Sequence, residues 1–212
     1  ADAGNSITLA DGVTLTSVSL LTMEASTGNI QRAGELTLMA GSGIMILESL
    51  ITSDSSNKLL VLYSDYESAG DGTLTIVSTK TVDSNNGDII LTAWDLDLSG
   101  SLISGSEEVS IHGAKAEQTV GLGVAQSMHV EDAEIGRVTA RGGLTVGSST
   151  GGSIAIGGLR DSSNDELGRI LFLTTGAGKT VTFETSASYF NKGISIQSAG
   201  GVSFSESMTS KQ

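Results

Sequence analysis

The sequence predicts an all-β protein built as a single-stranded parallel β-helix, or β-solenoid, with three short strands in each coil. The main observation is a recurring alternation of apolar and polar residues, seen most clearly at 87–113, where four such pulses begin about seven residues apart. Alternation over three to five residues indicates a short strand with one buried face, because successive side chains point to opposite sides of the backbone. Three such strands make a coil of about 20 residues, which is the repeat length of a solenoid.

The composition is the second observation that favours this fold. The chain has 212 residues with 28 Gly, no Pro, no Cys and only 4% aromatic residues. Proline cannot donate a backbone N–H and is kept out of central strands, so its absence fits a chain whose strands pair on both edges. The charged fraction of 17% is below the roughly 25% of ordinary soluble domains. Short Ser, Thr and Gly residues therefore supply most of the outward faces.

Strand-like alternation can be followed along nearly the whole chain. Before the central stretch it is found at 7–9, 13–15, 18–20, 36–38, 44–46, 50–51, 59–62, 74–76 and around Val82. After the central stretch it is found at 120–122, 128–130, around Ile135, and at 142–147, 152–157, 170–172, 181–183, 189–190, 194–196 and 202–204. Grouping these strands in threes predicts one domain, 1–212, of about seven to eight coils.

Two polar insertions and one ambiguous stretch interrupt this pattern. The insertions, at 63–72 and 159–168, carry Gly, Asp and Ser and are expected to be surface loops. Residues 114–134 are rich in Ala, Gln and Glu, which leaves a short helical turn there as an alternative. Gly121, Gly123 and the β-branched residues of that stretch weigh against a helix.

Charge and hydropathy exclude two classes of partner. The net charge is −13 and no run of Lys or Arg occurs, so the sequence lacks the basic surface that a nucleic-acid backbone needs. No apolar run approaches the roughly 18 residues that span a bilayer, so we expect no membrane span. The absence of Cys excludes disulfides and metal–thiolate sites.

Four stretches in the second half resemble the repeats of very large secreted adhesins of the filamentous-haemagglutinin type. They are QTVGLG at 118–123, EIGRVTA at 134–140, GGLTVG at 142–147 and GSIAIGGL at 152–159. The similarity lies in their order and spacing and covers about 87–204. The resemblance implies a right-handed parallel β-helix, export to the cell surface or the medium, and an adhesive or scaffolding role.

The ends of the predicted solenoid carry no segment that resembles a cap. Alternation begins within the first ten residues, and the last eight residues form a short polar segment. An uncovered coil exposes strand edges that recruit other strands. We therefore expect self-association by end-to-end stacking, or neighbouring repeats of a longer chain.

Asp95 and Asp97 are the main candidates for chemistry. They flank Leu96 and should share one outward face of a strand, with Leu96 and Leu98 on the inward face. β-Helix enzymes that cleave polysaccharides use outward carboxylates as general acid and base. No basic residue lies near this pair in the sequence, and Trp94 is the only tryptophan. A solvated strand face is favoured, and binding or cleavage of carbohydrate, such as surface glycans, is the alternative.

Two turn sequences carry the oxygen-bearing residues of weak calcium sites. The candidate ligands are Asp83, Asn85 and Asp88 in the first turn, and Asp161, Asn164 and Asp165 in the second. The first turn lacks the closing Glu of a calcium loop, because Trp94 occupies the twelfth position, and the second lacks the turn Gly. Asn and Asp are also common in ordinary turns. Beyond calcium, no cofactor is expected.

Other apparent motifs favour structural roles. Residues 176–180 read GAGKT, but Leu173 stands where a phosphate-binding loop needs its first Gly. His112 and His129 have no partner at metal-ligand spacing. The sequence as a whole predicts a non-enzymatic, extracellular or cell-surface structural or adhesive element.

Overall fold

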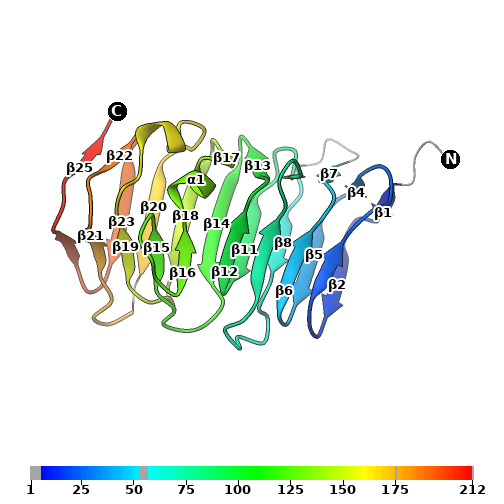
Figure 1. The fold of residues 1–212 in the computed structure, drawn as a ribbon, viewed down its shortest axis with the longest axis horizontal. Coiled ribbons are helices and arrows are strands. Elements are labelled where there is room, and N and C mark those ends of the chain that lie inside the picture. Colours follow the sequence, from blue (N-terminus) through cyan, green and yellow to red (C-terminus); the bar gives the residue numbers. More distant parts are fainter. Residues whose placement is uncertain (1–5, 53–56, 175, 212) are drawn as a thin grey trace.

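The computed structural model describes residues 6–52, 57–174 and 176–211. In this part of the chain the strands form five sheets, and the paired strands run parallel. The molecule is elongated, with the N-terminal strands at one end and the C-terminal strands at the other (Figure 1). The predicted all-β class is therefore confirmed.

The longest sheet, sheet B, extends along the molecule. Its strands in spatial order are β2 (Val13–Ser17), β5 (Leu36–Ala40), β8 (Leu60–Tyr63), β11 (Ile89–Ala93), β14 (Glu108–Gly113), β18 (Gly143–Ser148), β20 (Ile170–Thr174) and β23 (Ile194–Ser198). Neighbours in this sheet are never consecutive in the chain, because the intervening strands belong to other sheets.

A second side of the molecule is formed by sheet A and the short sheet E. Sheet A contains β1 (Ile7–Leu9), β4 (Ile30–Arg32), β7 (Leu50–Thr52), β10 (Thr81–Asp83), β13 (Ser101–Gly105) and β17 (Val138–Ala140). Sheet E contains β22 (Ser188–Phe190) and β25 (Met208–Ser210). Both lie along the upper side in Figure 1, with the 3₁₀ helix η1 (Asp161–Asn164) between them.

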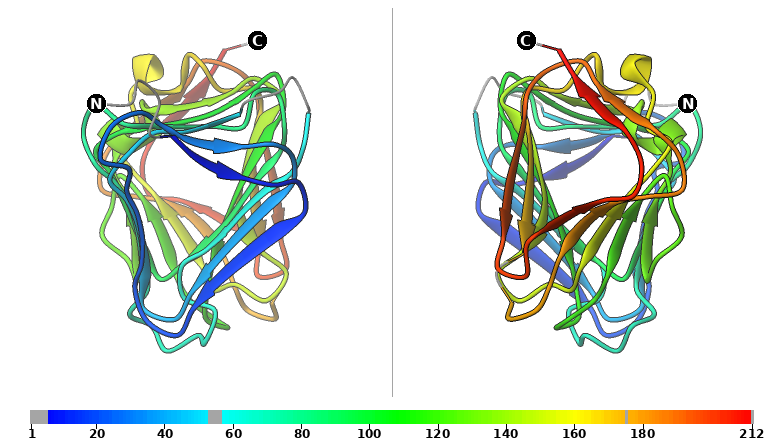
Figure 2. Two further views of the ribbon diagram at one scale, coloured as in Figure 1. Left: turned by 90° about the vertical axis from the view of Figure 1, so that its right-hand side faces the viewer. Right: turned by 90° about the vertical axis from the view of Figure 1, so that its left-hand side faces the viewer.

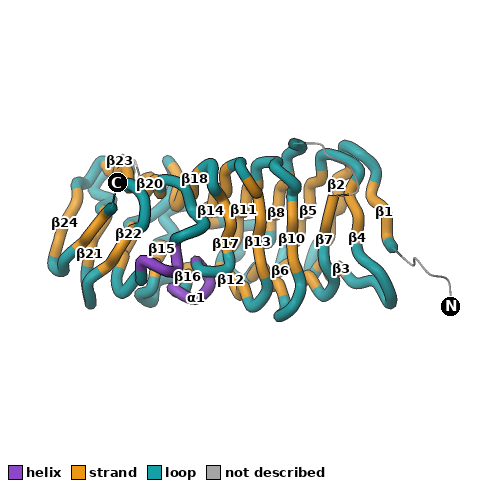
Figure 3. The backbone as a smooth tube through the Cα atoms, turned by 90° about the horizontal axis from the view of Figure 1, so that it is seen from above, coloured by secondary structure: helices purple, strands orange, loops and turns teal. Residues whose placement is uncertain are grey.

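Sheets C and D follow one another along the third side (Figure 3). Sheet C contains β3 (Leu21–Met23), β6 (Gly43–Ile46), β9 (Thr73–Ile76) and β12 (Asp95–Leu98). Sheet D contains β16 (Met128–Val130), β15 (Val120–Leu122), β19 (Ile154–Ile156), β21 (Val181–Phe183) and β24 (Val202–Phe204). The short helix α1 (Asp132–Ile135) follows β16.

Strand register aligns apolar residues into columns that fill the interior. In sheet B one column of Cα partners contains Val13, Leu36, Leu60, Ile89, Val109, Leu144, Ile170 and Ile194. Viewed along the long axis, the sheets surround this interior (Figure 2). The buried apolar side chains form one continuous cluster from Met23 to Phe190. Burying one such side chain contributes about 1.5–3 kcal/mol, so the columns are the main stabilising feature.

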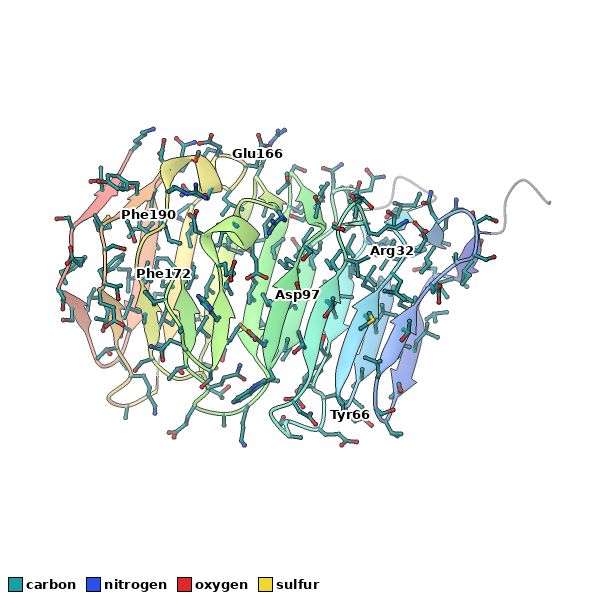
Figure 4. The ribbon with its side chains drawn as sticks, in the orientation of Figure 1. Arg32, Tyr66, Asp97, Glu166, Phe172 and Phe190 are labelled. Carbon is teal, nitrogen blue, oxygen red and sulfur yellow. The ribbon has the colours of Figure 1, made fainter. Side chains whose placement is uncertain are left out.

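Aromatic residues enlarge this core near its C-terminal end. Phe172, Phe183 and Phe190 are each about 1% exposed or less, and their ring centroids lie 6.1–6.4 Å apart in edge-to-face pairs (Figure 4). Phe204 stacks on Phe183 at 4.8 Å. Edge-to-face packing of this kind adds to the stability that burial alone provides.

The structure corrects two local expectations. The predicted strand at 18–20 is an exposed bend, with Val18 76% exposed, and the strand lies instead at β3, whose register places Leu21 opposite Ile44. The predicted strand around Ile135 is a helix, because Ile135 lies in α1, whose first residues form the short helical turn that was the alternative for 114–134. The strands predicted at 120–122 and 128–130 are confirmed as β15 and β16. Among the described residues, no helix is long and apolar enough to span a membrane.

Arg32 occupies an inward position in β4 and is fully buried. Its guanidinium donates hydrogen bonds to four backbone carbonyls, those of Gly34 (2.7 Å), Lys58 (2.8 Å), Leu59 (3.0 Å) and Ser84 (2.8 Å). Burial lowers the pKa of Arg32, and the negative charge of nearby Asp83 opposes that shift. One cation thus joins three chain segments that are far apart in the sequence.

We predict that Arg32→Met lowers the free energy of unfolding by about 3 kcal/mol or more, because several buried carbonyls lose their donor. Arg32→Lys should recover part of the loss. Arg141→Met is the matched control: the Arg141–Glu166 ion pair has side chains 66% and 55% exposed, and exposed pairs contribute little. Urea denaturation measures all three variants. Equal stability of the Arg32→Met and Arg141→Met proteins would contradict the bridging role of Arg32.

Candidate functional site

A polar cavity of about 340 Å³ opens where sheet C meets sheet D. β12 is the last strand of sheet C and β16 is the first of sheet D. The two strands lie side by side but belong to different ladders (Figure 1). The polar lining consists of Asp95, Asp97, Ser99, His129, Glu131, Glu134 and Arg137. This break between sheets is the candidate site, and we call it the β12–β16 break.

Side chains replace backbone hydrogen bonds across the β12–β16 break. Asp95 Oδ1 accepts a hydrogen bond from the backbone N–H of His129 at 2.9 Å. The backbone N–H of Leu98 donates to Glu134 Oε1 at 2.7 Å. The backbone carbonyl of Leu98 accepts a hydrogen bond from Arg137 Nη1 at 2.9 Å. Both backbone groups of Leu98, at the edge of sheet C, are therefore satisfied by charged side chains from the segment after β16.

Glu134 is held in place by the short helix that carries it. Its Oε2 accepts the backbone N–H of Glu131 at 2.8 Å, which is half of the reciprocal capping arrangement that an acidic residue at the third helical position provides. Ile135 is buried beside it, and Gly136 ends the helix. The side chain of Glu134 thus bridges α1 and β12.

The electrostatic environment of Glu134 favours its neutral form. Glu134 is only 7% exposed, and burial is the largest cause that raises its pKa. The backbone hydrogen bonds from Leu98 and Glu131 act in the opposite direction, while the negative charges of Glu131 and Asp95 raise the pKa further. The carboxyl group is therefore more readily protonated than an ordinary Glu.

The predicted orientation of the acidic pair on β12 is correct. Leu96 and Leu98 are 5% and 1% exposed, whereas Asp95 is partly exposed and Asp97 is exposed (Figure 4). Both carboxylates line the cavity, and Asp97 Oδ1 accepts a hydrogen bond from Ser99 Oγ at 3.2 Å.

Sequence reasoning missed the residues that the fold brings to this pair. Arg137 contacts the carbonyl of Leu98 across 39 positions of sequence, so the absence of a nearby basic residue holds for the sequence and not for the structure. His129 also lines the cavity. His112 lies elsewhere, with Nδ1 hydrogen-bonded to the carbonyl of Gly147 at 2.6 Å. The acidic stretch 131–134, two residues before Gly136, is the local signal of a capped turn here.

The first candidate calcium turn uses its oxygens in local hydrogen bonds. Asp83 Oδ1 accepts the backbone N–H of Asn85 at 2.7 Å, and Asp88 Oδ1 accepts that of Glu108 at 3.1 Å. Asn85 has a φ of 50°, a left-handed conformation that Asn adopts more easily than most residues. The bond to Asn85 is typical of an ordinary turn, and the bond to Glu108 links the turn to β14. Calcium binding there stays a prediction.

The second candidate calcium turn is similarly engaged. Asn164 Oδ1 and Asp165 Oδ1 accept hydrogen bonds from the backbone and side-chain nitrogens of Asn191, at 2.6 and 2.7 Å. Asp161 pairs with Lys211. Among residues 6–52, 57–174 and 176–211, no group of three His, Cys, Asp or Glu side chains is placed to hold a metal ion.

Comparisons with models of protein families, with curated proteins and with solved structures give no match. The resemblance to adhesin repeats therefore stays a prediction.

The arrangement of the β12–β16 break itself allows two roles: closure of a gap between sheets by charged side chains, and contact between Asp97 and a small polar ligand.

We predict that the contribution of Glu134 to stability depends on pH with the sign of its raised pKa. At neutral pH the charge on the buried Glu134 carboxylate destabilises the folded state. This destabilisation disappears as pH falls through the raised pKa of Glu134 in the folded state. The free energy of unfolding of the wild type, relative to that of Glu134→Gln, should therefore increase as pH falls from 7 to 4.5, the ordinary pKa of Glu.

Denaturant titrations of both proteins at several pH values measure this difference. A difference that moves in the opposite direction would show that the hydrogen bonds from Leu98 and Glu131 outweigh burial in setting the pKa of Glu134.

Proposed function

We propose that this chain is a right-handed parallel β-helix of about seven to eight coils, with three short strands per coil, and that it serves as a non-enzymatic structural or adhesive element. The observation that supports this proposal is the pairing pattern. From β1 to β14, each strand of sheets A, B and C pairs with the strand three places along the chain. Such a pattern is what a chain winding around one core produces.

The proposed relationship to filamentous-haemagglutinin-like adhesins has local support. The four stretches that carry the resemblance include β15, β17, β18 and β19. Their apolar residues at alternate positions are buried, as the coil walls of such repeats require. With this relationship we also propose that the protein lies outside the cell, at the cell surface or in the medium, as the resemblance implies.

The proposed mechanism is mechanical. Parallel ladders between successive coils distribute load over many backbone hydrogen bonds, and inward columns of Leu, Ile and Val keep the coils in register. A strand edge at the end of a stack can pair with a further coil, whether of another copy or of a longer chain. The protein would thereby act as a stiff unit in a fibre or surface assembly.

Small-angle scattering of the purified protein tests this architecture. Seven to eight coils stacked at about 4.8 Å give a rod on the order of 40 Å long for each copy, with a constant cross-section. A scattering profile of a sphere would contradict the proposal. Negative-stain images provide a second view, in which rods or filaments are expected.

Carbohydrate binding at the β12–β16 break is a second candidate function. The cavity of about 340 Å³ falls within the range of small-molecule sites, about 300–1,000 Å³. Asp97 and Glu131 are its exposed carboxylates. Against this function, Asp95, Glu134 and Arg137 already bond to the backbone of the neighbouring segment. Closure of the break accounts for these three residues, so we favour the structural role.

We predict that a panel of oligosaccharides leaves the melting temperature of the protein unchanged. The alternative function predicts a rise in melting temperature that Asp97→Asn abolishes. Asp71→Asn, which changes an exposed carboxylate in the 64–72 loop, is the control. A glycan-dependent rise that requires Asp97 and persists in the Asp71→Asn protein would replace the structural proposal for this site.

A further inference from the structure

One of two adjacent coils in the proposed stack contains 12 additional residues. β11, β12 and β13 form the first of these coils, and β14, β15 and β17 form the second. Before the third side of the molecule, Gln118 Nε2 donates a hydrogen bond at 2.6 Å to the carbonyl of Trp94, which is 24 positions away. After the third side, Leu102 and Val138 are Cα partners, and they are 36 positions apart. The additional residues therefore lie between Gln118 and Val138.

β16 is the additional strand. In the part of the chain that the structure describes, sheets C and D together contain nine strands, whereas sheet B contains eight. β11 pairs directly with β14, and β13 with β17, but β16 lies between β12 and β15 (Figure 1). Since neighbouring strands are about 4.7–4.9 Å apart, β12 and β15 are separated by roughly 9–10 Å. One strand thus holds the two coils apart on this side.

We propose that residues 124–135, which we call the strap, are an insert in one coil, that the stack is complete without them, and that β12 pairs directly with β15 when the strap is absent. The proposal rests on the stacked-coil architecture proposed above and adds a separable element to it. The strap contains β16 and α1, including Glu134 of the β12–β16 break.

Removal of the strap gives the two coils the same spacing between their strands. Leu98 of β12 and Leu102 of β13 are four positions apart. Without the strap, Leu122 of β15 and Val138 of β17 would also be four positions apart. Loop-closure entropy depends only weakly on loop length, so a coil can carry or lose such an insert at small entropic cost.

The inward residues of β12 and β15 match in the same register. The offset of 24 positions between Trp94 and Gln118 also relates Leu96 to Val120 and Leu98 to Leu122. The last four side chains are each 5% exposed or less. Besides β16, the ladder neighbour of β15 is β19, and that of β12 is β9. Removal of β16 would therefore leave two strand edges whose apolar columns continue from one to the other.

Gly121, the outward residue of β15, shows that the strap lies over this strand. The three atoms nearest to a Cβ added at Gly121 belong to the backbone of Val124 and the side chain of Gln126, both in the strap. The φ of Gly121 is not positive, so its conformation suits other residues. Contact with the strap is thus the reason for a glycine at this place.

Deletion of the strap, with Gly123 joined to Gly136, tests the proposal. The shortened protein should unfold cooperatively and keep the circular dichroism of a β protein. In it, Asp97→Cys with Gly121→Cys should form an intramolecular disulfide under mild oxidation, because these positions become Cα partners. Asp95→Cys with Gly121→Cys is the offset control, which about 8 Å between Cα atoms should prevent from forming a disulfide.

Alanine at Gly121 gives a second readout. Gly121→Ala should lower the melting temperature of the full-length protein by about 5 °C or more, because its methyl group meets the carbonyl of Val124. The same change should leave the melting temperature of the shortened protein unaltered. Gly142→Ala is the matched control: a Cβ there meets the backbone of Ser106 and Glu107, outside the strap, so it should destabilise both proteins.

Hydrogen exchange tests the full-length chain without any deletion. The backbone N–H groups of Gly123 and Leu98 donate to the strap, at the carbonyl of Val130 (2.8 Å) and at Glu134 Oε1 (2.7 Å). These two amides and that of Ile135 should exchange as one group, at least about tenfold faster than amides in the ladder between β11 and β14.

A folded shortened protein with the aligned disulfide, together with joint early exchange of the strap, supports the proposal. An unfolded shortened protein, no cross-link of the aligned pair, an efficient cross-link of the offset pair, or destabilisation of the shortened protein by Gly121→Ala overturns it. Exchange of the strap only on global unfolding also overturns it. In each of those cases a rod-like scattering profile of the full-length protein would still uphold the proposed architecture, so the two proposals can fail separately.

Discussion

Register between parallel strands is the constraint on which this structure depends. Each strand is three to six residues long and buries at most three apolar side chains, so no strand is stable alone. Stability arises when side chains such as Leu36, Leu60 and Ile89 stack in one column. A shift of one residue would turn such a column outward, which explains why the inward positions are so uniformly apolar. The absence of proline follows from the same constraint, because these strands bond along both edges.

Charged side chains bond to the backbone where the ladders cannot satisfy it. Arg32 does this where one strand turns toward the next, by donating to four carbonyls. Asp95, Glu134 and Arg137 do it at the β12–β16 break, where two edge strands meet without a shared ladder. A buried charge is costly unless it is hydrogen-bonded, and Arg32 and Glu134, the two buried members of this set, each bond to backbone groups. The charged side chains of the β12–β16 break thus have a structural role. Asp97 is the carboxylate of β12 that is most available to a ligand.

The amino-acid sequence was sufficient to predict most strands and the facing of Asp95 and Asp97, because both follow from local alternation. It did not reveal β4, since an inward Arg32 breaks the apolar pattern and its carbonyl partners lie up to 52 residues away. The break between sheets was equally hidden. Its hydrogen bonds join residues 34 to 39 positions apart, and they exist because β16 occupies the place next to β12 without entering its ladder. Local patterns specify strands, whereas gaps between ladders become visible only when the strands are assembled.

Cysteine cross-linking tests the central claim most directly, because the chain has no native cysteine. Ile90 and Ser110 are Cα partners on the outward face of β11 and β14. The account predicts that Ile90→Cys with Ser110→Cys forms an intramolecular disulfide under mild oxidation. Ile90→Cys with Glu108→Cys should not, since a two-residue offset separates the Cα atoms by about 8 Å. Efficient cross-linking of the offset pair, or none of the aligned pair, would contradict the proposed register.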